Sequence, residues 1–299
     1  MTSKILTLKN GFHIWTNTVG SNNPIKMITL HGGPGETNEG FELWGEFLKD
    51  QDLEITRYDQ LGSFYSDQPD FVNHPELAEK YLNIDYFVEE LEEIRTQLGY
   101  EKFILVGNSW GGMIAQQYAL KYQKNLSGLI IMSMTSREAD YGEALHEILH
   151  RTESIENANY VDQLLADEIY DDERENEILG RMFGNYFGRF DAPRTSHLID
   201  VKNHFVDEYM LGKNPFVSNG TLAGWDVENK VHQIKVPTYL TFGEDDLFAK
   251  EKIDLLHKNI AGSTLDFTPN GTHIHSREFP EIFFGNLIKW LEKNKAEFL

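Results

Sequence analysis

The 299-residue chain contains no cysteine. This absence excludes disulfide bonds, zinc sites built on thiolates and catalysis by a nucleophilic thiol. The chain also lacks an apolar run of about 18 residues, so the sequence predicts no membrane-spanning segment. The first residues, MTSKILTLKN, show no long apolar run after a basic patch and predict no secretory signal. We therefore expect a cytoplasmic protein with no membrane partner.

Positive charge is also scarce, since 27 Lys and Arg residues stand against 48 Asp and Glu residues and the net charge is −21. Such a surface repels nucleic-acid phosphates and anionic lipids, so neither is expected as a partner. The excess charge favours solubility, or it attracts cationic substrates. No Walker or dinucleotide glycine motif is present, and His273-x-His275 has no further ligands near it. We therefore expect no cofactor and no metal site.

Strand patterns alternate with helical patterns at both ends of the chain, which is typical of an α/β protein with a mostly parallel sheet. Asn10-Gly11 lies between the first two strand patterns and predicts a hairpin. Residues 136–220 carry helical patterns without a convincing strand. The sequence therefore predicts a core of residues 1–135 and 221–299, with residues 136–220 inserted as a helical cap.

A serine stands where an apolar strand meets a helix, in the segment Gly107-Asn108-Ser109-Trp110-Gly111. This is G-x-S-x-G between a predicted strand and a predicted helix, a context typical of a nucleophile elbow. The sharp turn strains the serine backbone, and glycine avoids clashes on both sides. The pattern predicts that the Ser109 hydroxyl is the nucleophile of a hydrolase, the alternative being a glycine turn with a capping serine.

A nucleophilic serine needs a base and an orienting carboxylate, which follow it in the order acid, then histidine, in this architecture. The strand pattern TYLTFG is followed by Glu244, Asp245 and Asp246. We favour Asp246 as the acid, with Asp245 as the alternative. After the last strand pattern come His273 and His275. We favour His273 as the base and expect His275 to be an exposed neighbour.

The oxyanion formed by attack on a carbonyl needs two backbone N–H donors. One is expected from Trp110, directly after the nucleophile. The other is expected from the loop His31–Gly35, because glycines let a backbone N–H point into the site.

Together these motifs resemble the α/β-hydrolases related to proline iminopeptidase. The motifs that carry the resemblance are an HGGPG loop, a YDQxG segment, a GxSxGG elbow, an acid loop and a late histidine, which stand here at His31–Gly35, Tyr58–Gly62, Gly107–Gly112, Gly243–Asp246 and His273. The resemblance covers both flanking parts of the chain well and the cap only weakly. It implies an α/β-hydrolase fold with a helical cap, and a peptidase that removes an N-terminal residue, with proline preferred.

The resemblance assigns Ser109, Asp246 and His273 to the triad, and Gly33 and Trp110 to the oxyanion hole. It also implies acidic side chains that bind the substrate's free amino group, one just after the catalytic aspartate and one in the closing segment of the cap. This chain departs from that pattern, because it has Leu247 and the acid-free stretch KNPFVSNG at those places. The substitutes that we consider are Glu244, Asp245, Asp207 and Glu208.

Cap aromatics complete the predicted pocket, with packing in the core as the alternative role; they are Phe183, Tyr186 and Phe187. The expected partner is a short peptide or an amino-acid-derived substrate. The alternatives in function are an esterase, lactonase or other carbonyl hydrolase with the same triad, and a non-catalytic ligand-binding protein on the same fold.

Overall fold

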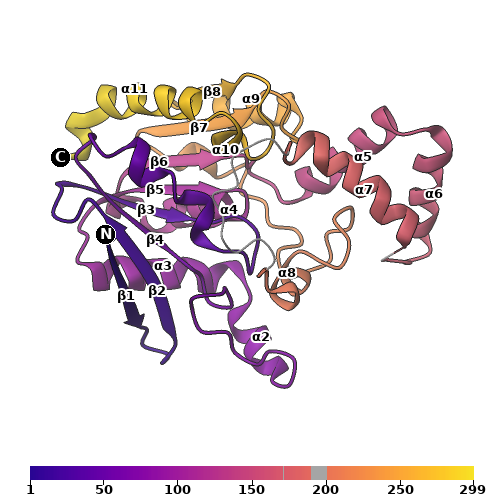
Figure 1. The fold of residues 1–299 in the computed structure, drawn as a ribbon, viewed down its shortest axis with the longest axis horizontal. Helices are drawn as coiled ribbons and strands as arrows, with labels where there is room; N and C mark the ends of the chain where they lie inside the picture. The colour runs from indigo at the N-terminus through magenta and orange to yellow at the C-terminus, as the bar shows by residue number, and fades with distance from the viewer. Residues whose placement is uncertain (171, 190–200) are drawn as a thin grey trace.

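A computed structural model describes residues 1–170, 172–189 and 201–299 of the chain. A sheet of eight strands forms its centre (Figure 1). Of the described helices inserted between β6 (Leu126–Met132) and β7 (Thr238–Gly243), α5, α6 and α7 extend to one side, and α8 lies closer to the strands. The α/β-hydrolase fold with a helical insertion predicted from the sequence is therefore confirmed. The boundaries 136–220 for the cap remain a prediction.

The strands run in the spatial order β1-β2-β4-β3-β5-β6-β7-β8. The first two form the hairpin expected at Asn10-Gly11, and β2 pairs with β4 in antiparallel fashion. All other neighbours are parallel. The carboxyl ends of the parallel strands therefore meet at one edge, where such sheets build their sites. The bounds are Thr2–Thr7, His13–Val19, Ile25–Leu30, Leu53–Tyr58, Phe103–Asn108, Leu126–Met132, Thr238–Gly243 and Thr264–Thr268 for β1 to β8.

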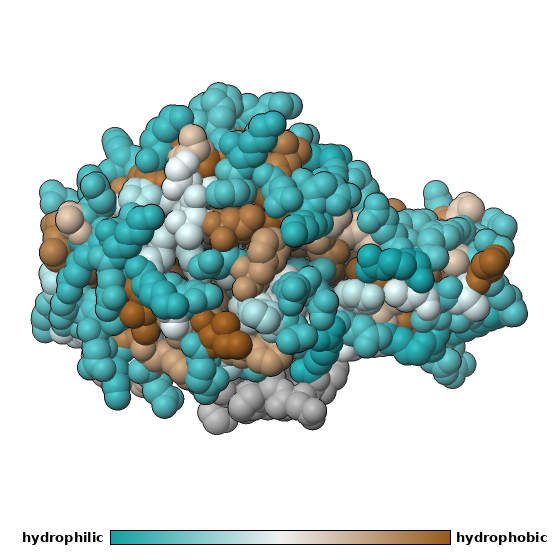
Figure 2. All heavy atoms as spheres, turned by 90° about the horizontal axis from the view of Figure 1, so that it is seen from above, coloured by the Kyte–Doolittle hydropathy of each residue, from teal (hydrophilic) through white to brown (hydrophobic). Residues whose placement is uncertain are grey.

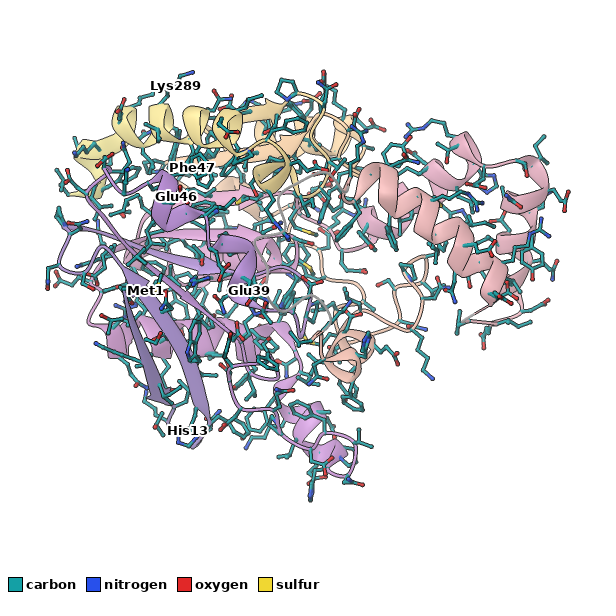
Figure 3. The ribbon with its side chains drawn as sticks, viewed as in Figure 1. Met1, His13, Glu39, Glu46, Phe47 and Lys289 are labelled. Carbon is teal, nitrogen blue, oxygen red and sulfur yellow. The ribbon has the colours of Figure 1, made fainter. Side chains whose placement is uncertain are left out.

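Each central strand buries both faces, which explains the continuous apolar runs in the sequence. In β5, Ile104 and Val106 belong to one hydrophobic cluster, whereas Phe103 and Leu105 belong to the other. The first cluster packs against α1 (Trp44–Phe47) and α11 (Pro280–Phe298), where the ring of Phe47 stacks on that of Phe284 with centroids 4.5 Å apart; Phe47 is labelled in Figure 3. The second packs against α3 (Ile84–Leu98) and α4 (Trp110–Tyr122). The sheet is thus a middle layer between two layers of helices.

The described helices divide into those of the core and those of the insertion. The structure adds two short helices that we did not predict, α2 (Pro75–Tyr81) and α10 (His275–Glu278). The others are α1 (Trp44–Phe47), α3 (Ile84–Leu98), α4 (Trp110–Tyr122), α9 (Lys250–Asn259) and α11 (Pro280–Phe298), with 3-10 turns at Asn38–Phe41, Gln123–Asn125 and Val231–Gln233. The inserted helices are α5 (Ala139–Thr152), α6 (Ile155–Ala166), α7 (Glu173–Tyr186) and α8 (His204–Met210).

The face of the molecule drawn in Figure 2 is mostly hydrophilic, with separate hydrophobic patches, as the charge of −21 leads us to expect. Within the described ranges, no helix is both long enough and apolar enough to cross a membrane.

Candidate active site

Ser109 lies between the end of β5 and the start of α4, and its backbone dihedral angles are φ 52° and ψ −120°. This is a left-handed φ that non-glycine residues rarely adopt, and it is the strain that the motif predicts. A Cβ on Gly107 would lie 2.1 Å from the carbonyl oxygen of Gly111, and one on Gly111 would lie 2.3 Å from that of Leu30. Side chains at either position would push the backbone apart, so the glycines are required by the close approach of β3, β5 and α4.

His273 and Asp246 meet at the same edge, with 3.0 Å between the imidazole Nδ1 and the carboxylate Oδ1. Both side chains are almost fully buried. Burial alone would raise the pKa of Asp246, but the adjacent imidazole outweighs it and the pKa lies below its ordinary value. The carboxylate is therefore ionised at neutral pH and holds a proton on the Nδ1 that faces it. That tautomer leaves Nε2 free to accept a proton.

Ser109 and His273 line one cavity of about 670 Å³. The Nε2 of His273 is buried and has no hydrogen-bond partner among the described residues. The structure thus brings the predicted nucleophile, base and acid to one edge of the sheet. The volume is in the range of pockets for small ligands.

The glycine loop His31–Gly35 borders the same cavity and is tied to the elbow through Gln60 of the YDQxG segment. Gln60 accepts a hydrogen bond from the indole of Trp110 at 2.7 Å. Its backbone N–H donates to Nε2 of His31 at 3.2 Å, and burial lowers the pKa of that histidine. His31 is therefore neutral, as an accepting nitrogen requires. This network fixes the loop relative to the elbow.

Both predicted oxyanion donors lie on the cavity. Trp110 is the first residue of α4, where a backbone N–H has no acceptor within the helix. Gly33 has φ +58°, and the side chain of Glu36 fills the space where its Cβ would stand. Because Glu36 N–H donates to the carbonyl of Gly33 at 3.0 Å, the turn folds the Glu36 carboxylate back over the loop.

The prediction that His275 is exposed is wrong, because its side chain is fully buried. Its Nδ1 lies 3.3 Å from the hydroxyl of Ser133 and its Nε2 lies 3.1 Å from that of Thr241. Burial lowers the pKa of His275 to about 4, so the ring is neutral. The Ser133 hydroxyl also donates to the carbonyl of His273 at 2.9 Å. His275 therefore packs beneath the loop that carries His273.

The inserted helix α7 forms the opposite wall of the cavity. Phe183 and Phe187 line it, and the ring of Phe187 stacks on His273 with centroids 4.7 Å apart. Tyr186 is not among the lining residues; it contributes its backbone carbonyl, which accepts the N–H of His273 at 3.0 Å. The cap is thus bonded directly to the loop of the predicted base.

Charged side chains of both signs reach the cavity. The Glu36 side chain is open to the cavity but lies deep among protein atoms, and this desolvation raises the pKa of its carboxyl, with Lys202 opposing the effect. Asp207 on α8 pairs with Lys202 at 2.6 Å, yet its Oδ1 is buried without a hydrogen-bond partner in the described ranges. Arg277 on α10 also lines the cavity; its charge also opposes the rise in the pKa of the Glu36 carboxyl, and its Nε is buried without a hydrogen-bond partner among the described residues. Besides Nε2 of His273, the cavity therefore holds one buried side-chain acceptor and one buried side-chain donor that lack a hydrogen-bond partner in the described ranges.

The other predicted substrate residues lie away from the cavity, since none of them is among the described lining residues. Asp245 pairs with Arg189 at 2.7 Å, Glu244 accepts the backbone N–H of Asn270 at 3.2 Å, and Glu208 is exposed. Of the two neighbouring acids on α8, only Asp207 faces the cavity.

Sequence reasoning missed Glu36 and Arg277. Both lie close to recognised motifs: Glu36 directly follows HGGPG, and Arg277 comes four residues after His273. That adjacency is the signal that could have identified them. Glu39 and Glu138 also line the cavity, and Glu39 is labelled at the sheet edge in Figure 3.

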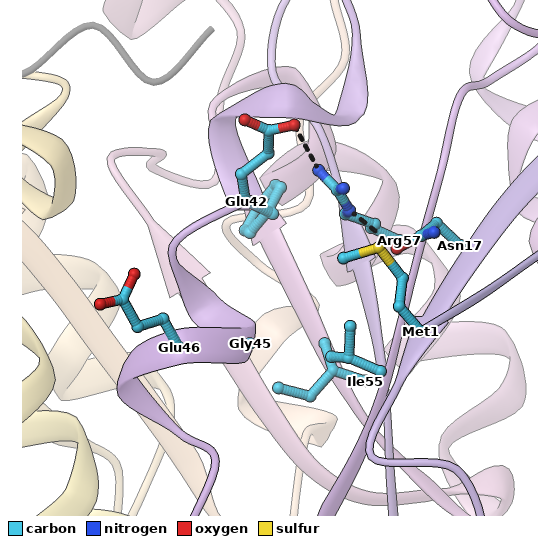
Figure 4. A pocket seen from close by; sticks show the side chains of 9 residues that line it. Met1, Asn17, Glu42, Gly45, Glu46, Ile55 and Arg57 are labelled. Carbon is cyan, nitrogen blue, oxygen red and sulfur yellow. Dashed lines mark hydrogen bonds and ion pairs between the residues drawn. The ribbon is translucent and has the colours of Figure 1, made fainter.

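A second cavity of about 250 Å³ lies between β2, β4 and α1 (Figure 4). Arg57 bonds there to Asn17 and pairs with Glu42 at 3.3 Å. Because no serine or histidine lines it among the described residues, this cavity is not the candidate site.

Comparison with known proteins agrees with the geometry. Residues 27–255 match the model of the alpha/beta hydrolase fold family. The chain is 33% identical to a proline iminopeptidase of Elizabethkingia meningoseptica, with 96% of each chain covered, and 31% identical to one of Flavobacterium johnsoniae, with 94% of each covered. A crystal structure of a proline iminopeptidase from Mycobacterium smegmatis superposes with a TM-score of 0.85 at 20% identity, covering 99% of both chains. The chain therefore belongs to the proline iminopeptidase family of α/β hydrolases.

Proposed function

We propose that the protein is a serine aminopeptidase that releases the N-terminal residue, preferably proline, from short peptides or amino-acid amides. The observation that carries the proposal is the placement of Glu36 and Asp207 in the cavity of Ser109 and His273. A triad alone would serve an esterase equally well, whereas two carboxylates in the same cavity favour a substrate with a free ammonium group.

The proposed reaction follows the acyl-enzyme route. Nε2 of His273 takes the hydroxyl proton of Ser109 as its oxygen attacks the acyl carbon, and Asp246 stabilises the imidazolium that forms. The N–H groups of Gly33 and Trp110 bind the oxyanion, each contributing roughly 3 kcal/mol of barrier lowering by analogy with donors in other hydrolases. His273 then protonates the leaving amine, and the C–N bond breaks. Water repeats the cycle on the ester and releases the free amino acid.

The position of Glu36 argues for selectivity as well as for binding. Its carboxylate lies over Gly33, close to where the oxyanion would form. A negative carboxylate destabilises a neighbouring oxyanion unless a cation lies between them. The ammonium group of a substrate with a free N-terminus supplies that cation. Neutral esters lack it, so they would react against the field of Glu36.

The aromatic wall suits the proposed residue. Phe183 and Phe187 present apolar surface, which favours a pyrrolidine ring over a charged side chain. The imidazole of His273 lies under the ring of Phe187, so a bound proline would exclude water from the base.

We further propose that Arg277 binds the C-terminal carboxylate of the substrate. A guanidinium whose Nε has no hydrogen-bond partner among the described residues keeps donors for a carboxylate. A dipeptide spans at most about 7 Å, so its ammonium and carboxylate can reach acids and arginine in one cavity. We therefore expect free dipeptides to be better substrates than their C-terminal amides. Arg277→Gln should remove the difference between Pro-Ala and Pro-Ala amide and leave the amide rate nearly unchanged.

Glu36→Gln tests the proposal most directly. We expect kcat/KM for prolyl arylamide to fall about 10- to 100-fold, because a buried charge-assisted contact is lost. Hydrolysis of a neutral aryl ester should stay constant or rise. Glu46→Gln, which alters an exposed acid on α1, is the matched control (Figure 3).

The proposal fails if the wild-type protein hydrolyses N-acetylated prolyl arylamide or plain esters as well as the free-amine amide. That outcome would support the esterase alternative. Labelling of Ser109 by a fluorophosphonate distinguishes both from a non-catalytic ligand-binding protein, which has no need of a reactive serine.

A further inference from the structure

A cluster of two histidines and one aspartate lies in the insertion, apart from the cavity. His146 and His150 are one helical turn apart on α5, so their side chains share a face. Asp162 reaches them from α6. None of the three is among the described residues that line the cavity of Ser109. The proposed reaction therefore leaves the cluster unexplained.

The three side chains already converge. Nε2 of His150 lies 3.1 Å from one carboxylate oxygen of Asp162, and Nδ1 of His146 lies 3.8 Å from the other. The two imidazole rings are stacked, with an interplanar angle of 11° and centroids 5.7 Å apart. One potential ligand atom from each residue lies within 4.8 Å of the other two.

Asp162 has one carboxylate oxygen without a hydrogen bond from the described residues. Its Oδ1 is buried and accepts no hydrogen bond within the described ranges. Buried carboxylate oxygens are normally bonded, because an unsatisfied one is costly. A cation placed between the three side chains would satisfy this oxygen.

We propose that His146, His150 and Asp162 form a binding site for a divalent transition metal such as Zn²⁺, which joins α5 to α6. Two imidazoles and a carboxylate are donors that zinc accepts, with water as the fourth ligand. Ca²⁺ and Mg²⁺ prefer oxygen ligands alone and are excluded by the two nitrogen donors. The proposal departs from the expectation of no metal site, which considered His273 and His275 and not the i, i+4 pair.

The geometry requires little movement to bind the ion. Ligands around tetrahedral zinc are about 3.3 Å apart when each bond is near 2.0 Å. The contact between His150 and Asp162 already has nearly this length. His146 must move closer to Asp162, and its side chain is 44% exposed, so it has the freedom to do so.

The site would stabilise the outer part of the cap. The helices α5 and α6 follow each other directly and lie at the end of the molecule farthest from α11 (Figure 1). A metal bound by both adds a crosslink that the folded state has and the unfolded chain lacks, so it raises stability by mass action. Because α5 also carries Tyr141 to the cavity, the crosslink reaches an element of the substrate site.

The test uses the untagged full chain, freed of metal by chelation, and Zn²⁺ alone as the probe. Calorimetric titration should give one site, and saturating Zn²⁺ should raise Tm by about 2 °C or more. Co²⁺ should give a visible absorption band of a low-coordinate site. Mg²⁺ and Ca²⁺ should produce neither effect.

Variants locate the site. His146→Gln with His150→Gln should abolish the Tm rise, and Asp162→Asn should weaken Zn²⁺ binding about 10-fold or more. The matched control is His74→Gln, which alters an exposed histidine beside a carboxylate, Glu76 at 3.1 Å, and should bind Zn²⁺ like the wild type. Circular dichroism in chelator establishes that each variant folds.

Zn²⁺ binding that survives unchanged in the double histidine variant would overturn the proposal, as would a wild-type chain that binds no Zn²⁺. Stabilisation by Ca²⁺ or Mg²⁺ in place of Zn²⁺ would also contradict it, since the donor set predicts the opposite preference. If the double histidine variant does not fold and Asp162→Asn does, Zn²⁺ binding by Asp162→Asn compared with the wild type tests the site.

Discussion

The edge of the sheet and the inserted helix α7 face each other across one cavity, but they differ in how closely their backbones are packed. At the edge, a Cβ on Gly107 would lie 2.1 Å from a backbone oxygen, and Ser109 is held at a strained φ. On α7, a Cβ on Gly180 or Gly184 would meet no described atom within 4 Å outside the backbone of the helix itself. Backbone contacts fix the wall that holds Ser109, whereas the helix that lines the opposite wall has room for added side-chain atoms. If the proposed function holds, the difference teaches that chemistry and specificity can vary independently here.

Removing the hydroxyl of Ser109 should have the largest effect on activity and should leave the packing of both walls unchanged. For Ser109→Ala we expect kcat to fall about 10⁴-fold or more, because no other group can form the acyl-enzyme. Tm should stay almost unchanged, since alanine at this backbone carries the same strain. Turnover of prolyl arylamide and a thermal melt measure the two quantities. Ser263→Ala, on the loop after α9, is the control; residual activity equal to that control would refute the role of Ser109.

A methyl group at the rigid wall should destabilise the fold. Gly107→Ala forces its new Cβ against the backbone of Gly111, and we expect a loss of about 3 kcal/mol in the free energy of unfolding. Gly285→Ala on α11 is the control, because a Cβ there meets no atom of another described segment within 4 Å. Urea denaturation compares the two. Equal stability of both variants would show that the edge is less rigid than we conclude.

A buried acid below the edge should make stability depend on pH. Burial raises the pKa of Glu90 on α3 from 4.5 to about 8. Between these values the folded protein keeps a proton that the unfolded chain releases, so stability falls as pH rises from about 5 to about 8. We expect Glu90→Gln to remove on the order of 2 kcal/mol of that fall. Melts across this pH range test it, with Glu79→Gln, an exposed acid on α2, as control; identical pH profiles for the two variants would contradict it.

The smallest change in stability is expected on α7, the helix that lines the cavity opposite Ser109. Gly180→Ala should stabilise α7 by about 0.5–1 kcal/mol, because alanine is the better helix former. Its methyl group would enter the cavity, so kcat/KM should fall more for bulky N-terminal residues than for proline. Melting curves and a series of aminoacyl arylamides measure both. A loss of stability would mean that α7 is packed as tightly as the sheet edge.

The pattern along the chain was sufficient to predict the elbow and the order of the functional loops. Apolar strands, flanking glycines and the late acid and histidine depend on local spacing, and the structure places Ser109, Asp246 and His273 at one edge as expected. The burial of His275 was not predictable, because it depends on Ser133, directly after β6, and on Thr241 within β7.

Neighbouring residues with the same chemistry mark the limit of sequence reasoning. Asp207 and Glu208 are adjacent acids on α8, and only the packing of that helix decides that Asp207 faces the cavity. Glu36 lies there because a turn folds its side chain over Gly33. The spacing of His146 and His150 is visible in the sequence, but the approach of Asp162 is not, since it requires α6 to pack against α5.

The sequence by itself determined the fold family, the strained serine turn and the residue types available for acyl transfer, because each depends on spacing within a short segment. Only the tertiary structure decided which charges share the cavity with Ser109 and which histidine is free to act. Those assignments depend on contacts between segments far apart in the chain, and no local pattern encodes the direction in which a side chain points once the helices and strands have packed.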